Sequence, residues 1–239
     1  MRRFYAPVQN FEKDTVYLDE NETRHLRDVL RLREGEEINV FDGEGREFLC
    51  EVQKIGKKRT DLRVISEISP TAPESSLDLT LATALLKGEK FDLVIQKSVE
   101  LGVKQLTPLI THRCDVKLKD RGNKIGRWER IALEAAKQSG RASLMRIDEP
   151  TDFFQMLKTE KSIGMIMFSE REGSSFDKIV AEKEIVAITG PEGGWEDSEI
   201  EAAREAGAVI ITLGGRVLRA ETAAVAIMAI LQHRFGDLK

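Results

Sequence analysis

Two glycine-bearing loops near the C-terminus hold the residue types best suited to bind a ligand. The first loop, residues 190–195 (GPEGGW), follows the apolar run 185–188, and the second, residues 213–223, follows the apolar run 209–211. Each loop is predicted to end a strand and open a helix, and the carboxyl ends of neighbouring strands are where open α/β sheets bind ligands. Neither loop contains a G-x-G-x-x-G or G-K-[ST] fingerprint, which disfavours a Rossmann or P-loop site and predicts a pocket of another kind.

The first loop combines three glycines with one carboxylate. Gly190, Gly193 and Gly194 would let backbone groups approach a ligand closely, although they could also form a simple tight turn. Glu192 could accept hydrogen bonds from ribose hydroxyls or cap the helix that follows. Trp195 could be a stacking surface or part of the core, and the sequence leaves these alternatives open.

Arg219 and Glu221 stand at the start of a predicted helix over residues 221–235 whose first turns are almost entirely apolar. A helix of this composition is predicted to be buried on nearly every side, so its start is predicted to be buried too. Buried charges are costly unless they are paired or bound to a ligand. Arg219 and Glu221 are therefore candidate catalytic residues, with Arg219 beside a substrate that develops negative charge. The alternative is a structural pairing of Arg219 with Glu221 or with the backbone.

Basic and polar side chains elsewhere are candidates for contacts with phosphates, or else ordinary solvated charges. Lys87 follows a predicted strand, and Gln138 and Arg141 share one helical face near the end of a helix predicted over residues 125–139. The predicted contact residues are Arg24, Arg27, Arg31, Lys87, Arg113, Gln138 and Arg141. Residues 1–76 nevertheless contain more acidic than basic side chains, so any basic face there is local.

The elements that must position these residues divide the chain into two predicted domains. Residues 1–70 are predicted to form a small β-barrel, with a hairpin over 37–52 and a short helix over 22–30 that is capped by Asn21. Residues 71–76 have the composition of a linker. From residue 77 to residue 239, strands alternate with helices, which predicts an α/β domain with a mostly parallel sheet covered on both faces.

Composition narrows the functional class further. The chain has 239 residues, a net charge of −4 and 41% hydrophobic residues, which is typical of a globular protein with a sizeable core. Two cysteines without a C-x-x-C spacing fit a reducing cytosol, and three histidines without a shared spacing predict no metal site. The N-terminus lacks the apolar stretch of a signal peptide, and the apolar run 223–231 is too short to span a bilayer, so no membrane association is expected.

The two loops together resemble the signature loops of a known family. Residues 188–195 and 213–223 are similar to those of the ribosomal RNA small subunit methyltransferase E family, within the SPOUT class of knotted methyltransferases. Residues 24–31, 87–90, 96–103 and 134–139 also resemble the family, so the likeness covers essentially the whole chain. The chain departs from the family pattern at Cys114, where Ser is frequent, and near residues 144–145, where Pro is frequent.

The resemblance implies a fold and an activity. The fold is a PUA-like, RNA-binding β-barrel followed by a SPOUT sheet with a deep trefoil knot near the C-terminus, a rare exception to unknotted topology. The activity is S-adenosylmethionine-dependent methylation of N3 of one uridine in the 16S rRNA of the small ribosomal subunit, by a cytoplasmic homodimer. A non-catalytic ribosome-assembly factor and a knotted enzyme for ribose 2′-oxygen or a tRNA base are the alternatives.

The resemblance also implies roles for individual residues. Arg219 and Glu221 are implied to be catalytic, while the proton acceptor is open among Glu221, a water molecule and an RNA phosphate. The implied cofactor-binding residues are Thr189, Gly190, Glu192, Gly193, Gly194, Leu213, Gly214, Leu218, Ala220 and Thr222. The candidate phosphate contacts become candidate RNA contacts.

Overall fold

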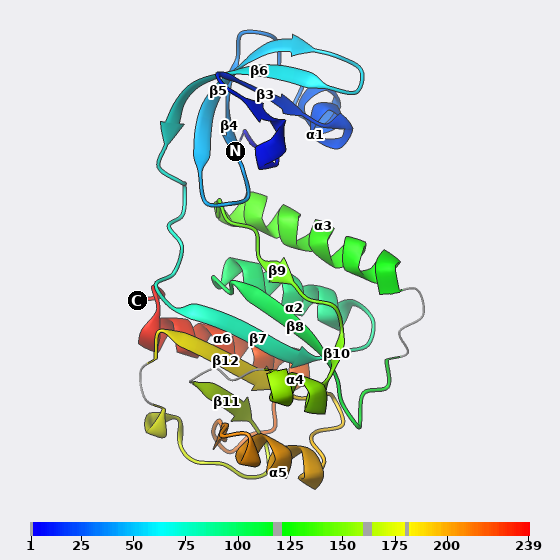
Figure 1. Ribbon diagram of the computed structural model, residues 1–239, viewed down its shortest axis with the longest axis vertical. Helices are drawn as coiled ribbons and strands as arrows, with labels where there is room; N and C mark the ends of the chain where they lie inside the picture. The colour runs from blue at the N-terminus through cyan, green and yellow to red at the C-terminus, as the bar shows by residue number, and fades with distance from the viewer. Residues whose placement is uncertain (1, 117–120, 160–163, 180–181) are drawn as a thin grey trace. The chain divides into compact units, whose positions relative to one another are not determined.

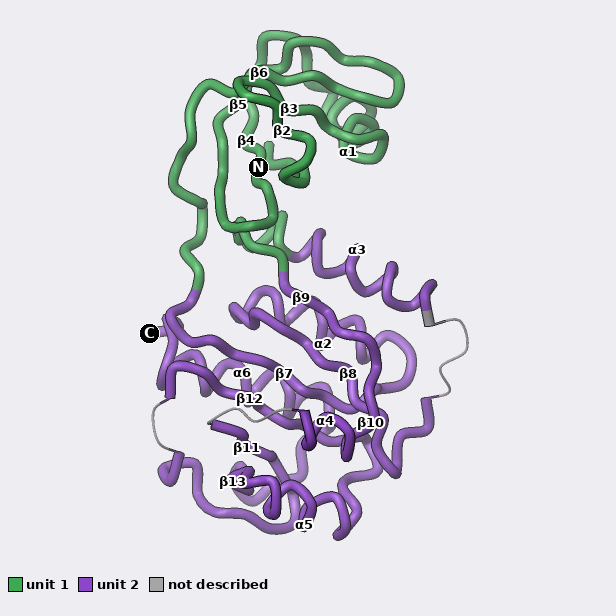
Figure 2. Tube along the Cα trace, in the orientation of Figure 1, with its two compact units in different colours: residues 1–74, 136–144 green, residues 75–135, 145–239 purple. Residues whose placement is uncertain are grey.

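The computed structural model describes residues 2–116, 121–159, 164–179 and 182–239 (Figure 1). The chain forms two compact units (Figure 2). Unit 1 comprises residues 1–74 and 136–144, and unit 2 comprises residues 75–135 and 145–239. None of the described helices has both the length and the apolar composition needed to cross a membrane.

Unit 1 is built on a six-stranded sheet with the order β1-β4-β5-β6-β3-β2. Its strands are β1 (Arg3–Tyr5), β2 (Phe11–Glu12), β3 (Thr15–Leu18), β4 (Glu37–Phe41), β5 (Glu47–Ile55) and β6 (Thr60–Ile68). Strands β4 and β5 form the hairpin that the sequence predicts. Their inward side chains, among them Ile38, Val40 and Val52, are buried with Phe4 and Leu62 in one apolar core. The alternation of buried and exposed positions therefore fixes which face of the sheet is covered.

The helix of unit 1 begins earlier than the sequence predicts. Helix α1 (Glu20–Arg24) is capped by Asp19, whose carboxylate accepts a hydrogen bond from the Glu22 backbone N–H at 2.9 Å. The prediction of Asn21 as the cap is wrong, because Asn21 already lies within the first helical turn. The helix continues as a π-helical turn over His25–Val29.

Residues 136–144 complete unit 1 by supplying acceptors to a buried ion pair of that unit. The Arg3 guanidinium bonds to the Glu47 carboxylate at 3.1 and 3.2 Å, and both side chains are almost fully buried. Arg3 also donates to the backbone carbonyls of Ala136 at 3.0 Å and Arg141 at 2.8 Å. The backbone N–H of Thr71 donates to Glu47 at 3.1 Å. These bonds satisfy a charge pair that would otherwise be costly to bury.

Unit 2 contains a parallel sheet with the order β10-β8-β7-β12-β11-β13, and β9 pairs with β8 beside it. Its strands are β7 (Asp78–Ala84), β8 (Gln105–Ile110), β9 (Arg146–Ile147), β10 (Thr151–Asp152), β11 (Met165–Phe168), β12 (Glu184–Thr189) and β13 (Val209–Ile211). Its helices are α2 (Glu89–Glu100), α3 (Arg121–Ser139), which continues into unit 1, α4 (Phe153–Thr159), α5 (Asp197–Glu205) and α6 (Ala220–Phe235). Every ladder of this sheet is parallel, which confirms the predicted α/β class.

Candidate functional site

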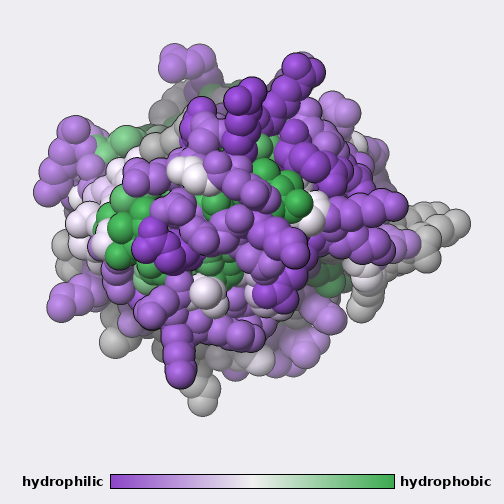
Figure 3. Space-filling model, turned by 90° about the horizontal axis from the view of Figure 1, so that it is seen from above, coloured by the Kyte–Doolittle hydropathy of each residue, from purple (hydrophilic) through white to green (hydrophobic). Residues whose placement is uncertain are grey.

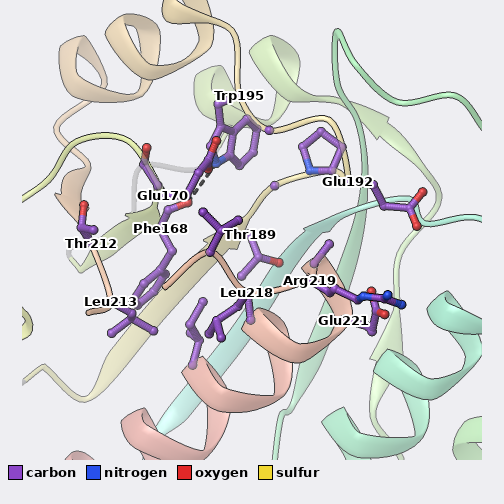
Figure 4. Close-up of a pocket in the computed structure, with 18 of the residues that line it drawn as sticks. Phe168, Glu170, Thr189, Glu192, Trp195, Thr212, Leu213, Leu218, Arg219 and Glu221 are labelled. Atoms are coloured by element: carbon purple, nitrogen blue, oxygen red, sulfur yellow. Dashed lines mark hydrogen bonds between the residues drawn. The ribbon is translucent and has the colours of Figure 1, made fainter. Parts of the chain in front are cut away.

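The two glycine-bearing loops line a single cavity of about 530 Å³ in unit 2 (Figure 4). Strands β12, β11 and β13 are neighbouring and parallel, so their carboxyl ends meet at one edge of the sheet and bring the loops together. Residues 168–170 follow from the end of β11, residues 189–195 from β12, and residues 212–221 from β13. Lys90, Ala223 and Ile227 complete the lining.

Packing explains the glycines of the first loop. A Cβ on Gly190 would lie 2.8 Å from the Trp195 indole, and a Cβ on Gly194 would lie 2.5 Å from Oε1 of Glu170. Gly194 also has a φ of +71°, which disfavours other residues. Trp195 is 0% exposed, and its Nε1–H donates to the Phe168 carbonyl at 2.9 Å. Of the two alternatives for Trp195, the core position is therefore the one observed.

Glu192 is held by a lysine from another element. The Lys90 ammonium, in the first turn of α2, forms an ion pair with the Glu192 carboxylate. Glu192 does not cap the following helix, because Glu196 and Glu199 form the capping box of α5. The helix-cap alternative is thus wrong, and the contact with ribose stays a prediction.

The second loop leads to two charged side chains that have no partner in the part of the chain that the structure describes. Arg219 is the N-cap residue of α6 and is exposed, and its side chain makes no hydrogen bond or ion pair with the described residues. The Glu221 side chain is half-buried, and its Oε2 is shielded from water without a hydrogen-bond partner. Both residues lie on the same side of the cavity (Figure 4). Arg219 and Glu221 do not form the ion pair with each other that was the structural alternative.

The start of α6 is also less covered than the sequence predicts. Val217 is 81% exposed, Leu218 is 37% exposed, and Ile230 further along the helix is 36% exposed. The prediction that α6 is buried on nearly every side is therefore wrong for a single copy of the chain. An apolar helix with an uncovered side is a surface that a partner can bury.

Comparison with known proteins assigns a family. The sequence model for an RNA methyltransferase domain matches residues 73–232, and that for an RNA methyltransferase PUA domain matches residues 18–65. The ribosomal RNA small subunit methyltransferase E of Bacillus subtilis is 31% identical over 98% of this chain and 97% of its own length. The same enzyme of Synechocystis is 35% identical over 95% of this chain and 76% of its own length.

The chain belongs to the ribosomal RNA small subunit methyltransferase E family. A solved structure of the family agrees with the fold. The methyltransferase E from Neisseria gonorrhoeae, crystallised bound to S-adenosyl methionine, is 35% identical, covers 100% of both chains and superposes with a TM-score of 0.92. The predicted combination of a PUA-like domain with a SPOUT methyltransferase domain is confirmed.

The structure gathers nearly all of the predicted cofactor and catalytic residues of this methyltransferase family member in the cavity. Those that line it are Thr189, Gly190, Glu192, Gly193, Gly194, Leu213, Gly214, Leu218, Arg219, Ala220 and Glu221. Thr222 is exposed and lies outside the lining, because one residue after Glu221 the helix turns its side chain to another face.

The predicted RNA contacts of unit 2 are exposed and already paired. Lys87 donates to Asp115 at 2.7 Å, and this hydrogen bond raises the pKa of Lys87 and lowers the pKa of Asp115. Arg113 bonds to Glu196 at 2.6 Å and donates to the Gly193 carbonyl at 2.9 Å. The hydrogen bond with Glu196 raises the pKa of Arg113. Both cations remain predicted RNA contacts, and Arg113 also supports the first loop.

The predicted RNA contacts of unit 1 are Arg24, Arg27 and Arg31. The face of the molecule drawn in Figure 3 is mostly hydrophilic, with smaller hydrophobic areas. Arg24 is exposed and pairs with Glu20 at 3.7 Å. Arg27 bonds to Asp28 at 2.7 and 2.8 Å. Arg31 is exposed, with the left-handed φ of 54° that is uncommon outside glycine.

The last two predicted contacts lie in residues 136–144. Gln138 is exposed, so it remains a predicted RNA contact. Arg141 is 4% exposed, and its guanidinium bonds to Glu74 at 2.7 Å. We therefore correct the prediction for Arg141, since a buried, bonded guanidinium supports the fold of unit 1 and cannot present its charge to a phosphate.

The lining residues that were not among the predicted site residues include Lys90, Phe168, Glu170 and Thr212. Phe168 is the last residue of β11, Glu170 follows two positions later, and Thr212 follows β13 directly. The rule that ligands bind at the carboxyl ends of strands would have found these three. Lys90 was overlooked because its pairing with Glu192 joins segments that are far apart in sequence.

Proposed function

We propose that this chain is an S-adenosylmethionine-dependent methyltransferase that methylates N3 of a specific uridine in the 16S rRNA of the small ribosomal subunit. Family membership supports the class of reaction. The relative from Neisseria gonorrhoeae, bound to S-adenosyl methionine, supports the cofactor. The observation that carries the proposal is the cavity edge where the side chains of Arg219 and Glu221 have no partner among the described residues.

The cavity suits this cofactor in size and lining. A volume of about 530 Å³ falls within the range of small-molecule pockets. Backbone groups at Gly190, Gly194, Leu213 and Leu218 would hold the adenosine, and the glycines leave room for close approach. When bound, the cofactor supplies an activated methyl group. The work of the protein is then to align the uracil N3 with that methyl group and to exclude water.

Arg219 stabilises the charge that the reaction creates. Uracil N3 carries a proton at neutral pH, and its loss spreads negative charge onto the two flanking carbonyl oxygens. A guanidinium beside those oxygens interacts more strongly with the charged transition state than with the neutral base, and this difference accelerates the reaction. The Arg219 side chain is exposed and makes no bond to the described residues, so its donors are available for this task.

Glu221 is the proton acceptor that we propose. Its carboxylate receives no hydrogen bond from the described residues, and a largely shielded carboxylate without a donor favours a ligand that brings one. Glu221 lies two residues from Arg219, so one side chain can take the proton while the other stabilises the remaining charge. A water molecule or an RNA phosphate in the same role would leave the Glu221→Gln variant active.

The proposal extends to the assembly of the protein, its topology and the role of unit 1. We propose that two copies associate through α6, where Ile230 is exposed, and through the preceding Leu218, which is exposed too. We also propose that the chain near α6 forms a trefoil knot. We further propose that unit 1 binds the rRNA and that the enzyme works in the cytoplasm. The target base must leave its stack to reach the cavity.

The deciding experiment follows a labelled methyl group from S-adenosylmethionine into small ribosomal subunits that lack the modification. Nucleoside analysis should find the label in 3-methyluridine. Label in a ribose-methylated nucleoside, or acceptance of tRNA alone, would indicate another knotted enzyme. Tight binding to the subunit without any transfer would indicate an assembly factor.

A further inference from the structure

Two segments of unit 1 that are separate in sequence carry exposed cations and contact one another. The first is α1 with its π-helical continuation, and the second is the loop 56–59 between β5 and β6 (Figure 1). Arg27 joins them, because its Nη1 donates to the backbone carbonyls of Gly56 and Lys57, both at 3.3 Å. Its other two nitrogens bond to Asp28 at 2.7 and 2.8 Å. Arg27 therefore holds the loop beside the helix.

The other cations of these two segments are paired weakly. The side chains of Arg24 and Lys58 lie 3.7 and 3.6 Å from the two oxygens of one carboxylate, that of Glu20, and all three side chains are exposed. Lys57 is exposed as well and makes no ion pair with the described residues. Exposed ion pairs of this kind contribute little free energy, so a phosphate group can replace them. Three cations are thus available to one anionic partner.

Arg59, the last residue of the same loop, offers a flat surface. Its guanidinium lies 4.1 Å from the centre of the Tyr17 ring, and its Nε donates to Asp61 at 2.5 Å. These two contacts fix the plane of the guanidinium, yet the Arg59 side chain stays 59% exposed. A guanidinium that stacks on a ring with one face can stack a second planar group on the other.

We propose that the loop and the helix form one binding surface for unpaired nucleotides of RNA. This surface consists of Tyr17, Arg24, Lys57, Lys58 and Arg59. Arg59 stacks a base on its open face, and the other three cations bind the flanking phosphates. Only an unpaired nucleotide presents the face of its base, because a duplex keeps its bases stacked inside. The inference rests on the proposed function and names the part of unit 1 that meets the rRNA.

Titration of the full chain with two RNA probes tests the stacking. The probes are a labelled oligouridylate of about 12 nucleotides and the same strand paired with oligoadenylate. The single strand should bind more tightly. Arg59→Lys keeps the charge but removes the flat guanidinium, so it should weaken single-strand binding about 5- to 150-fold and leave its salt dependence unchanged. Arg63→Lys is the matched control, because Arg63 bonds to Glu51 at 2.6 Å and stacks on no ring of the described residues. It should not change the affinity.

The salt dependence of the same titration tests the phosphate contacts. Each phosphate contact with a single strand contributes about 0.7 to the slope of log affinity against log salt concentration. The double variant Lys57→Ala, Lys58→Ala should therefore lower that slope by about 1.4. Lys13→Ala is the control, since Lys13 lies in the turn before β3, at the opposite end of that strand from Tyr17. It should leave the slope unchanged.

Each contrary outcome overturns the proposal. These outcomes are equal or tighter binding of the duplex, no binding of the single strand by the parent protein, an Arg59→Lys variant that binds like Arg63→Lys, and an unchanged slope in the lysine variant. Methyl transfer to small ribosomal subunits by the parent protein keeps the proposed function separate. Transfer without any of the expected binding effects removes this surface alone, whereas the absence of transfer removes the proposed function.

Discussion

Charged side chains are used differently on the two sides of the cavity. Around the first loop they are paired with one another, as Lys90 with Glu192 and Arg113 with Glu196. At the start of α6, Arg219 and Glu221 have no partner among the described residues. Paired charges hold a backbone in place, whereas unpaired charges are available to substrate. The comparison therefore separates residues that shape the cavity from residues that act in it.

Arg219→Ala should have the largest effect if that separation is correct. Loss of a charge-stabilising donor costs about 100- to 1000-fold in rate, so single-turnover methyl transfer should fall by that factor while the cofactor dissociation constant changes less than about threefold. Arg204→Ala on α5 is the control, since Arg204 pairs with Glu201 outside the cavity. A parallel loss of rate and cofactor affinity in Arg219→Ala would assign Arg219 a structural role.

Glu221→Gln should reduce the transfer rate by about 100-fold, because it removes the proposed proton acceptor but keeps the shape of the side chain. Binding of S-adenosylhomocysteine should stay close to that of the parent protein. Rates measured from about pH 6 to pH 9 provide a second check, since hydroxide can replace the missing base as the pH rises. A pH-independent rate equal to that of the parent would leave a water molecule or an RNA phosphate as the acceptor.

Gly190→Ala tests whether packing of the first loop fixes the shape of the cavity. A Cβ at residue 190 would lie 2.8 Å from the buried Trp195 ring, so we expect a loss of about 1–3 kcal/mol in the free energy of unfolding. Gly215→Ala is the matched control, because its Cβ would meet no atom within 4 Å. Chemical denaturation followed by tryptophan fluorescence measures both variants. Equal stability of the two would show that the loop relaxes around the added methyl group.

The Lys90–Glu192 ion pair should contribute a smaller free energy, which we expect to see in ligand affinity. Its side chains are 39% and 31% exposed, and pairs of this kind contribute about 1 kcal/mol or less. A double-mutant cycle of Lys90→Met and Glu192→Gln, read out as the affinity for S-adenosylhomocysteine, should give a coupling energy of that size. Additive effects would mean that each side chain acts on the ligand independently, and that Glu192 belongs with the acting residues.

The smallest effect is expected for the Lys87–Asp115 pair, and it concerns the stability of the folded chain. The hydrogen bond from Lys87 lowers the pKa of Asp115 below its ordinary value, so the pair stabilises the folded chain above the unfolded pKa. That contribution is lost as the pH falls through the lower, folded pKa. Asp115→Asn should therefore be slightly less stable than the parent at about pH 7 and equal to it at about pH 2. A difference that persists in acid would exclude the ion pair as its cause.

The sequence predicted features that depend on local pattern. Alternation over residues 37–52 gave the β4–β5 hairpin, and the apolar runs before residues 190 and 213 located the strand ends that build the cavity. Parallel strands bring their carboxyl ends to one edge of a sheet. The sequence alone could therefore predict that the two loops line one site, although they are separate in sequence. The family resemblance led to the same loops.

Features that depend on long-range packing were beyond the sequence. The burial of Arg141 requires Glu74 and the return of residues 136–144 to unit 1, and no local pattern indicates either. The exposure of Arg219 was missed because the apolar composition of α6 does not tell whether the start of the helix is covered within one chain. The choice of Asp19 over Asn21 as the cap depends on one turn of backbone geometry.

Unit 1 is built from two separate segments of the chain, and this affects its folding during synthesis on the ribosome. Its buried Arg3 reaches backbone carbonyls at Ala136 and Arg141, which leave the ribosome long after the strands that surround Arg3. Until then the Arg3 guanidinium lacks two carbonyl acceptors that it needs for burial. We therefore expect the nascent N-terminal barrel to remain incompletely protected until translation has passed residue 144, so that maturation of the first unit waits for the middle of the chain.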